Sequence, residues 1–429
     1  MPVPTMPKIL LDWKNDPAPL EVVRRLRSDG HEAYLAGGCV RDLVLGLSPK
    51  DHDIATSATP QQVSATFKRT IPVQTELGVT MVLWGDSRLE VTTYRTEGAY
   101  LDGRRPSSVG PADAKLDVQR RDFTINGLLL DPETGEIHDH VGGLEDLHAG
   151  VLRCIRDARE RFEEDHLRIL RAVRFAVRFS LRIDPATWAA MCELSAKTAG
   201  LSGERIHEEL AKMDAQGSFA TAVDLLTDSG VLRALGPELD GAMARSDSRE
   251  RMRRILSAST ENVAGAWVAF LGLPLCPWWN TPTSKGLAGT VTPAQEALLE
   301  RLRCSRSESD AASFAWTRWA PCWEAPPPRP SQQASLVRDK SWPTLRAVLD
   351  RHSRAFPEAW SPLPHLIDLA ERIPKSVPPL GKEFLAAGIP KGPILGEAIR
   401  EADRLNLDEG LALDEALVTR IAETILGRT

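Results

Sequence analysis

Two aspartates, Asp51 and Asp53, stand two residues apart in the stretch DHDIA. The stretch reads as a β-strand, on which residues i and i+2 point to the same side. Two carboxylates placed in this way raise each other's pKa and destabilise the fold unless a cation lies between them. Mg²⁺ meets this requirement, because it binds one or two carboxylates and completes its shell with water and substrate phosphates. We therefore interpret Asp51 and Asp53 as metal ligands and catalytic residues; the alternative is a strand end at the surface.

Nearby residues favour nucleotide chemistry over the alternative. Gly37 and Gly38 allow the backbone to approach a triphosphate closely. Arg41 follows within the reach of one helix and can fork onto phosphate oxygens. Glu90 falls on the polar face of a later strand and is a candidate third catalytic carboxylate, which binds metal or accepts the proton of an attacking hydroxyl.

A second polar cluster lies in the stretch RRDFTINGL. Arg121 is a candidate phosphate clamp. Asn126 is suited either to hydrogen-bond a ribose hydroxyl or to position a loop. The alternative is a surface pair of arginines in which Asp122 is an ordinary helix cap.

The stretch RFEEDHLRILRAVRFAVRF, residues 161–179, predicts one helix with an apolar stripe and an arginine stripe. The arginine stripe consists of Arg168, Arg171, Arg174 and Arg178. Such stripes are normally solvated faces with ion pairs between neighbouring turns. Here the arginines outnumber the acids near them in sequence, so we expect them to be free to meet an anion. The carboxylate of Asp165 and the guanidinium of Arg168 offer an acceptor and donors that can pair with a base edge. We therefore expect this helix to read the base of an incoming nucleotide.

The elements that position these residues can also be predicted. An amphipathic helix spans 18–28, strands cover 32–36 and 51–55, and a helix opens at the Thr59-Pro60 cap. Strands 79–84 and 88–95 pair, and residues 139–155 supply a glycine turn and then a strand. From about residue 149 the pattern becomes helical, over 157–195, 203–235 and most of the remainder. The proline-rich stretch 324–333 is a predicted linker or exposed turn. The fold class is α+β: a small α/β head followed by a helical body.

Bulk composition sets further limits. A chain of 429 residues is long enough for several domains. The net charge of −6 requires any nucleic-acid surface to be locally basic. No apolar run is long enough to span a membrane, and the N-terminal residues lack a signal pattern. The six cysteines form no CxxC pair, which is typical of reduced thiols, so we expect a cytoplasmic protein.

The motifs, taken together, resemble a known family. GGCVRDLVLG, DHDIATSATP, RRDFTINGL, EEDHLRILRAVRF and ERIHEEL follow one another between about residues 30 and 215. In this order they resemble the bacterial class II CCA-adding tRNA nucleotidyltransferases and poly(A) polymerases of the polymerase-β-like superfamily. The resemblance implies a nucleotidyltransferase head with a mixed sheet (1–148), a helical neck that recognises the base (149–215), a helical body (216–333) and a helical, tRNA-binding tail (334–429).

The resemblance also implies roles for individual residues and for partners. It makes Asp51 and Asp53 the Mg²⁺ ligands, with Glu90 as a third carboxylate. The implied nucleotide-binding residues are Gly38, Arg41, Arg121, Asn126, Asp165, Arg168, Arg171 and Arg174, among which Asp165 and Arg168 act as a protein template for CTP or ATP. The tRNA 3′-hydroxyl attacks the α-phosphorus and pyrophosphate leaves. No membrane and no protein partner are expected.

Within this family the sequence favours CCA addition. Residues 95–109 correspond to a flexible loop that CC-adding relatives lack, so CC addition is disfavoured. Addition of the terminal A alone remains open, because A-adding enzymes keep every catalytic residue. Poly(A) polymerisation is a further alternative. A non-catalytic RNA-binding relative is the alternative from another class, although a binding protein has no need for paired strand carboxylates.

Overall fold

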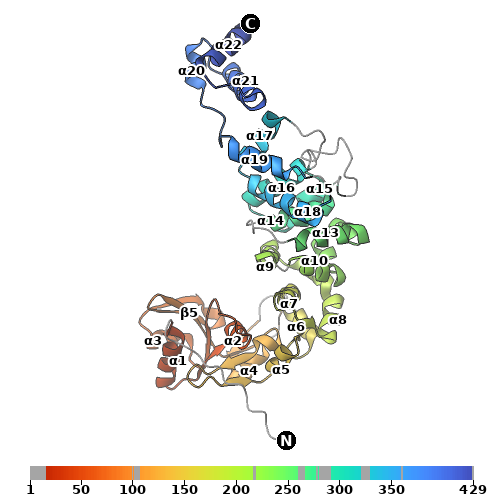
Figure 1. The fold of residues 1–429 in the computed structure, drawn as a ribbon. Helices are drawn as coiled ribbons and strands as arrows, with labels where there is room; N and C mark the ends of the chain where they lie inside the picture. Colours follow the sequence, from red (N-terminus) through yellow and green to blue (C-terminus); the bar gives the residue numbers. More distant parts are fainter. Residues whose placement is uncertain are drawn as a thin grey trace. The chain divides into compact units, whose positions relative to one another are not determined.

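The computed structural model describes residues 16–98, 100, 107–215, 219–258, 266–276, 279, 291–319, 329–358 and 361–427. The chain divides into two compact units, residues 1–235 and 236–429. The first unit holds a mixed β-sheet and helices, and the second unit, over its described residues, holds only helices (Figure 1). The expected α+β class, with a small α/β head followed by helices, is confirmed. The finer division at 148, 215 and 333 stays a prediction.

A seven-stranded sheet forms the centre of the head, in the order β3-β4-β5-β2-β1-β8-β9. Its strands are β1 (Ala33–Ala36), β2 (Asp53–Thr56), β3 (Thr70–Gln74), β4 (Val79–Trp84), β5 (Ser87–Thr93), β8 (Leu128–Leu130) and β9 (Ile137–Asp139). Within it only β2 and β5 run parallel, and the other neighbours are antiparallel. Two small ladders lie apart from it: β6 (Arg95–Glu97) with β7 (Val109–Pro111), and β10 (Val151–Leu152) with β11 (Arg182–Ile183).

The sheet register follows from hydrophobic alternation. On β5, Leu89 and Val91 are buried whereas Glu90 is exposed, as the sequence predicts. The parallel pairing sets Glu90 opposite Asp53, the first residue of β2. Two carboxylates from neighbouring strands therefore meet at one end of the ladder.

Helices in the head begin and end at clear sequence signals. α1 (Ala18–Ser28) has the predicted bounds and buries one apolar face. α2 (Gly38–Val44) follows Gly37, and α3 (Pro60–Thr66) starts at a capping box formed by Thr59 and Gln62. The remaining helices of the sheet region are α4 (Ala114–Gln119), the 3₁₀ turns η1 (Thr75–Leu77) and η2 (Thr124–Asn126), and α5 (Gly143–His148). The expected glycine turn at 139–155 is present, but α5 lies between it and strand β10 because left-handed Gly142 starts a helix.

The helical part of the first unit differs from prediction in two places. Its helices are α6 (Ala158–Glu164), α7 (Leu167–Arg178), α8 (Pro185–Leu194), η3 (Ser195–Gly200), α9 (Gly203–Ala215), α10 (Phe219–Asp228) and α11 (Val231–Leu235). The single helix expected over 161–179 is wrong, because the backbone is extended at Asp165. The uninterrupted helical run over 157–195 is also wrong, since β11 pairs with distant β10, a contact that local periodicity cannot reveal.

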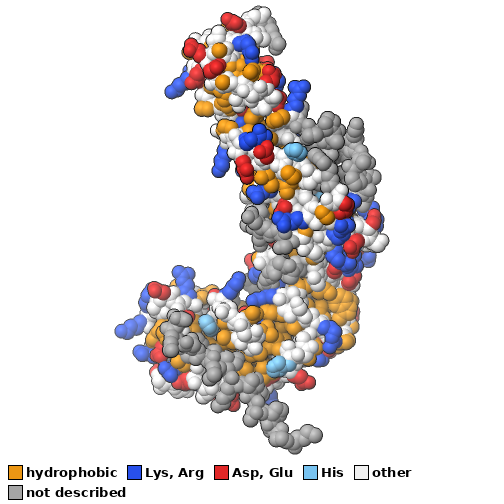
Figure 2. All heavy atoms as spheres, in the orientation of Figure 1, with side chains coloured by type: hydrophobic (Ala, Val, Ile, Leu, Met, Phe, Trp, Pro, Cys, Tyr) orange, Lys and Arg blue, Asp and Glu red, His pale blue; other side chains and the backbone are white. Residues whose placement is uncertain are grey.

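The second unit consists of helices, with both charge signs interspersed on its surface (Figure 2). They are α12 (Pro237–Met243), α13 (Ser246–Ser257), α14 (Ala266–Gly272), η4 (Leu273–Leu275), α15 (Pro293–Arg301), α16 (Arg306–Trp319), α17 (Pro330–Arg338), α18 (Trp342–Ala355), α19 (Leu363–Arg372), α20 (Gly381–Ala386), α21 (Pro393–Glu409) and α22 (Glu415–Leu426). The last three share a core around Phe384. Most of the predicted linker 324–333 lies outside the described residues, and its final residues already belong to α17.

Two observations concern the cellular setting. None of the helices that the structure describes combines the length and apolar character needed to cross a bilayer. The cysteines at 39, 154, 192, 276 and 304 are free thiols, and Cys322 lies outside the described ranges.

Gly143 allows α5 to pack tightly against the η2 turn. A Cβ at this position would lie 2.2 Å from the carbonyl oxygen of Thr124. We expect Gly143→Ala to lower the free energy of unfolding by about 2 kcal/mol, because backbone must move to relieve the overlap. Urea-induced unfolding of the full chain measures this change. Gly200→Ala is the control, since a Cβ there meets nothing within 4 Å; an equal loss in both variants would contradict the packing argument.

Candidate active site

One cavity of about 830 Å³ in the first unit gathers the predicted residues. Of the eleven candidates, ten line it: Gly38, Arg41, Asp51, Asp53, Arg121, Asn126, Asp165, Arg168, Arg171 and Arg174. They come from β1–α2, the start of β2, the α4–η2 turn and the α6–α7 junction. Residues more than 100 positions apart in sequence therefore line the same cavity.

The cavity lining is strongly cationic. Ten lysine and arginine side chains line it, against five aspartates and glutamates. The cations that sequence reasoning did not assign to the site are Arg95, Arg120, Arg178, Arg205 and Lys212. A concave surface with this excess of positive charge attracts polyanions such as a nucleoside triphosphate.

Asp51 and Asp53 both line this cavity. Asp53 opens β2, but Asp51 precedes the strand instead of belonging to it, because the β2 ladders start only at residue 53. Burial, and then the nearby charges of Glu90 and Asp51, raise the pKa of Asp53 to about 6, although Arg121 opposes the shift. A metal cation bound here would favour the ionised form of Asp53.

Glu90 is the candidate that does not line the main cavity. It faces a smaller cavity of about 240 Å³, which shares Asp53, Arg95, Arg120 and Arg121 with the larger one. In the described part of the chain, no three His, Cys, Asp or Glu side chains are grouped so that they could hold a metal ion. A metal at this site would thus take two protein carboxylates and draw its remaining ligands from water and substrate, which suits Mg²⁺.

Gly37 permits a close approach between the β1–α2 turn and Arg121. Its φ is +75°, and a Cβ there would lie 2.7 Å from Nη1 of Arg121. Arg121 donates to Asp117 at 3.2 Å, while its buried Nε has no partner in the described structure. Arg121 therefore keeps a donor for an anion. Of the two glycines named from the sequence, Gly37 is the one with a positive φ, whereas the resemblance assigned the nucleotide contact to Gly38.

The side chain of Asn126 joins Arg41 of α2 to Asp122, which precedes η2. Its Oδ1 accepts from Arg41 at 2.5 Å, and its Nδ2 donates to Asp122 at 2.9 Å. Arg41 is buried and also holds Asp42 at 2.6 Å. Of the two roles considered for Asn126, these contacts serve positioning.

The arginine stripe of α7 has acidic partners after all. Arg168 pairs with Glu164, Arg171 with Asp122, Arg174 with Glu209 and Arg178 with Asp42, at 2.5, 2.5, 2.6 and 3.3 Å. The expectation that these arginines are free of acids is wrong, because three of the four partners lie 35 to 136 positions away in sequence. Even so, all four arginines line the cavity.

Asp165 lies in the break between α6 and α7. Its Oδ1 accepts from the backbone N–H of Leu167 at 3.0 Å, and Arg205 of α9 donates to both carboxylate oxygens at 3.1 and 2.9 Å. Its carboxylate is not paired with Arg168, whose guanidinium is held by Glu164 at 2.5 Å. Both groups nevertheless reach the cavity, and each is fixed by a separate partner.

Comparisons with known proteins agree with this geometry. Residues 33–153 match a family model described as the poly A polymerase head domain, and residues 180–243 match a probable RNA and SrmB-binding site of polymerase A. A CCA-adding enzyme of Enterococcus faecalis is 44% identical over 208 residues, or 47% of this chain and 51% of the relative. One from Streptococcus pneumoniae is 38% identical over 257 residues, or 59% and 62%.

Solved structures extend the likeness along the chain. The crystal structure of a Bacillus stearothermophilus CCA-adding enzyme in complex with CTP has a TM-score of 0.74 and 27% identity, over 95% of this chain and 97% of its own. This chain is therefore similar to a CCA-adding enzyme over nearly its whole length, and its head matches the poly A polymerase head-domain model. The sequence match to the curated family members spans only about half to three fifths of their length.

Nucleotidyltransferases of the matched kind normally use a divalent metal ion. The residues present here fit one, since Asp51 and Asp53 line the same cavity, and burial with the nearby charge of Glu90 raises the pKa of Asp53 to about 6 despite Arg121.

Sequence reasoning assigned no site role to Glu97 and Tyr100, which line the cavity. Tyr100 donates to Glu97 at 2.5 Å, and its ring lies 5.8 Å from the guanidinium of Arg168. Glu97 also pairs with Arg95 and Arg120. Residues 99 and 101–106 of the predicted loop 95–109 lie outside the described residues. Local spacing does not predict these contacts, although Arg95 and Glu97, two positions apart on a strand, are a weak signal of an ion pair.

Asp122 generates a pH-dependent prediction. Burial would raise the pKa of its carboxyl, but the Arg171 ion pair and the hydrogen bond from Asn126 hold that pKa well below its usual range. The carboxylate therefore contributes stability above the unfolded pKa of about 4, and the contribution is lost as the pH falls through the folded pKa. We expect Asp122→Asn to cost about 3 kcal/mol at pH 7 and progressively less towards pH 2.

Urea unfolding of the parent and the variant at several pH values measures this difference. Glu160→Gln is the control, because its ion pair with Arg156 is exposed and should contribute under about 1 kcal/mol at any pH. A cost for Asp122→Asn that stays constant from pH 7 to pH 2 would refute the assigned charge state.

Proposed function

We propose that this chain adds C, C and A to the 3′ end of tRNA, using CTP and ATP, Mg²⁺ and no nucleic-acid template. The observation that carries the proposal is the shared cavity, to which the Asp51–Asp53 pair and the Asp165/Arg168 pair both contribute. The first pair offers carboxylates for a metal, and the second offers groups that suit a base edge. The names of the curated relatives, all CCA-adding enzymes, support the same substrate class.

The base-side chemistry favours cytosine and adenine. Both bases present an exocyclic amino group next to an unprotonated ring nitrogen, whereas uracil and guanine present a carbonyl next to an N–H. A carboxylate accepts only and a guanidinium donates only. Asp165 would accept from the amino group, and Arg168 would donate to the ring nitrogen. The wrong bases would leave both protein groups facing like partners, which costs about 1–3 kcal/mol per pair.

The phosphate side follows from the cation excess. Arg121, with its unpartnered Nε, and the α7 residues Arg171 and Arg174 would neutralise the triphosphate. Gly37 and Gly38 keep the β1–α2 turn free of side chains beside it. Most of the rate acceleration in such a transfer comes from positioning and preorganised charge.

The proposed role of the carboxylates is to activate the 3′-hydroxyl oxygen of tRNA. Asp51 and Asp53 would hold Mg²⁺, which when bound supplies charge neutralisation and lowers the pKa of the 3′-hydroxyl. Glu90, across the strand pair from Asp53, is the proposed third carboxylate beside that hydroxyl. The hydroxyl attacks the α-phosphorus, the bond to the β-phosphate bridging oxygen breaks, and pyrophosphate leaves.

The rest of the chain is proposed to hold the RNA. The match of residues 180–243 to an RNA-binding family model supports this for the end of the first unit and the start of the second. We propose the neck, body and tail roles for 149–215, 216–333 and 334–429, with tRNA contacts concentrated in the tail.

Metal-site variants test the catalytic proposal. With tRNA lacking its CCA end, labelled CTP and Mg²⁺, we expect Asp51→Ala/Asp53→Ala to reduce incorporation about 10³-fold. The fold should persist, because the change removes two mutually repelling carboxylates. Glu160→Ala/Glu163→Ala on exposed α6 positions is the control. Undiminished incorporation by the aspartate variant would eliminate the metal assignment.

The tRNA end decides between family activities. We expect the chain to add CCA to tRNA that lacks all three nucleotides when CTP and ATP are both present. Gel analysis of the labelled product reads the number of residues added. Extension only of tRNA that already ends in CC would identify A addition, and a long A tail would identify poly(A) polymerisation; either result overturns CCA addition.

A further inference from the structure

Arg161 is a buried arginine of α6 that the proposed chemistry does not use. Its exposed fraction is 1%, and it does not line the cavity. A buried guanidinium is costly unless its donors are satisfied, so its partners indicate what it does.

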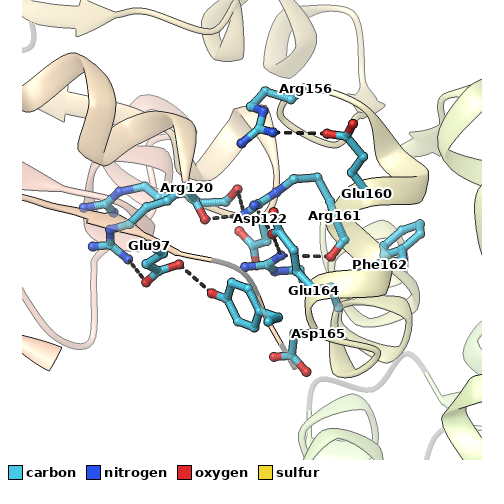
Figure 3. Close-up of polar contacts among 12 residues, drawn as sticks. Glu97, Arg120, Asp122, Arg156, Glu160, Arg161, Phe162, Glu164 and Asp165 are labelled. Carbon is cyan, nitrogen blue, oxygen red and sulfur yellow. Dashed lines mark hydrogen bonds and ion pairs between the residues drawn. The ribbon is translucent and has the colours of Figure 1, made fainter. Parts of the chain in front are cut away.

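One side of Arg161 fastens the turn that carries Arg121. Its Nη2 donates to the backbone carbonyl oxygens of Arg120 and Arg121, the latter at 2.7 Å (Figure 3). These residues follow α4 in the head, some 40 positions earlier in the sequence. Arg161 therefore holds the backbone of the residue whose side chain approaches Gly37 and Asp53.

The other side of Arg161 fastens Arg168 through Glu164. Its Nη1 donates to Oε2 of Glu164, and the same oxygen accepts from Nη1 of Arg168 at 2.5 Å. Arg168 also donates to the backbone carbonyl of Arg161 at 2.8 Å. Glu164 is the last residue of α6 and directly precedes Asp165, so these bonds also fix the start of the break. Figure 3 shows Glu164 lying between the α6 helix and the head residues.

The contacts close into a ring around the cavity wall. Arg121 and Arg120 both pair with Asp117, and Arg120 pairs with Glu97. Glu97 accepts from Tyr100, whose ring lies against Arg168. Arg161 closes this ring, because it bonds both Glu164, the partner of Arg168, and the backbone carbonyl of Arg121. A lysine, with a single nitrogen, lacks the forked geometry needed for all of these acceptors.

We propose that Arg161 is a positioning residue that fixes Arg168 relative to Arg121, so that base selection depends on where the triphosphate is held. The inference rests on the proposed function for the roles of Arg168 and Arg121. In this arrangement a nucleotide whose phosphates sit on Arg121 brings its base to one fixed place against Arg168 and Asp165. Without Arg161, Arg168 and Arg121 would both still line the cavity, but the distance between them would no longer be fixed.

Equilibrium binding to the full chain tests this coupling. Calorimetry would measure CTP, UTP and tripolyphosphate, the last of which contacts only the phosphate side. For Arg161→Met we expect CTP to bind about tenfold more weakly and the preference for CTP over UTP to fall by a similar factor. Tripolyphosphate affinity should change less than about threefold. Arg159→Met, an exposed arginine of the same helix, should match the parent throughout.

A parallel loss of CTP and tripolyphosphate binding in Arg161→Met would overturn the proposal, since it would report general loosening. An unchanged CTP/UTP preference would overturn it too. Should circular dichroism show that Arg161→Met is unfolded, Glu164→Gln carries the test, because it weakens the Arg161–Glu164–Arg168 link without removing the guanidinium, and the same selective loss is expected. A parent that binds CTP but transfers nothing to tRNA would refute only the proposed function; a parent that binds no CTP would refute both.

Discussion

Repulsion among guanidinium groups is the constraint on which the cavity depends. Nine arginines line this cavity, and without acidic partners their mutual repulsion would push apart the elements that carry them. Buried acids from separate elements compensate the α7 arginines: Asp42 from α2 pairs with Arg178, Asp122 before η2 with Arg171, and Glu209 from α9 with Arg174. Each of these ion pairs joins two elements. The same contacts therefore compensate the charge and hold the elements of the first unit together. Removing one acid would leave a buried cation without a partner, which is far costlier than losing an exposed pair.

Local sequence patterns predicted most of the head. The 3.6-residue periodicity of 18–28, the Thr59 cap and the alternation of Leu89, Glu90 and Val91 each rest on interactions within a few residues, and each is realised. The failures share a different cause. Strand β11 exists because it pairs with β10, and the helix ends before Asp165 although the periodicity of 161–179 continues across it. Pairing across distance is invisible to a local window.

The site shows the same division. Residue types and spacing, together with the family resemblance, selected ten cavity-lining residues, because carboxylate pairs, glycine turns and arginine stripes are local patterns. What the pattern could not supply was the partner of each group. The bond from Arg205 to Asp165 spans 40 positions, and that from Arg178 to Asp42 spans 136. An arginine that looks unpaired in sequence can therefore be fully paired in space.

Two phenylalanine rings, Phe175 on α7 and Phe179 directly after it, also contact the cations. Arg41 and Arg174 lie 5.2 and 4.2 Å from the Phe175 ring, and Arg41 and Arg178 lie 4.4 and 4.6 Å from the Phe179 ring. An aromatic face attracts a cation through its quadrupole but brings no formal negative charge. The rings thus give the guanidinium groups packing partners while the local field stays positive. Capture of a polyanion should accordingly weaken as ionic strength rises and mobile counter-ions shield that field.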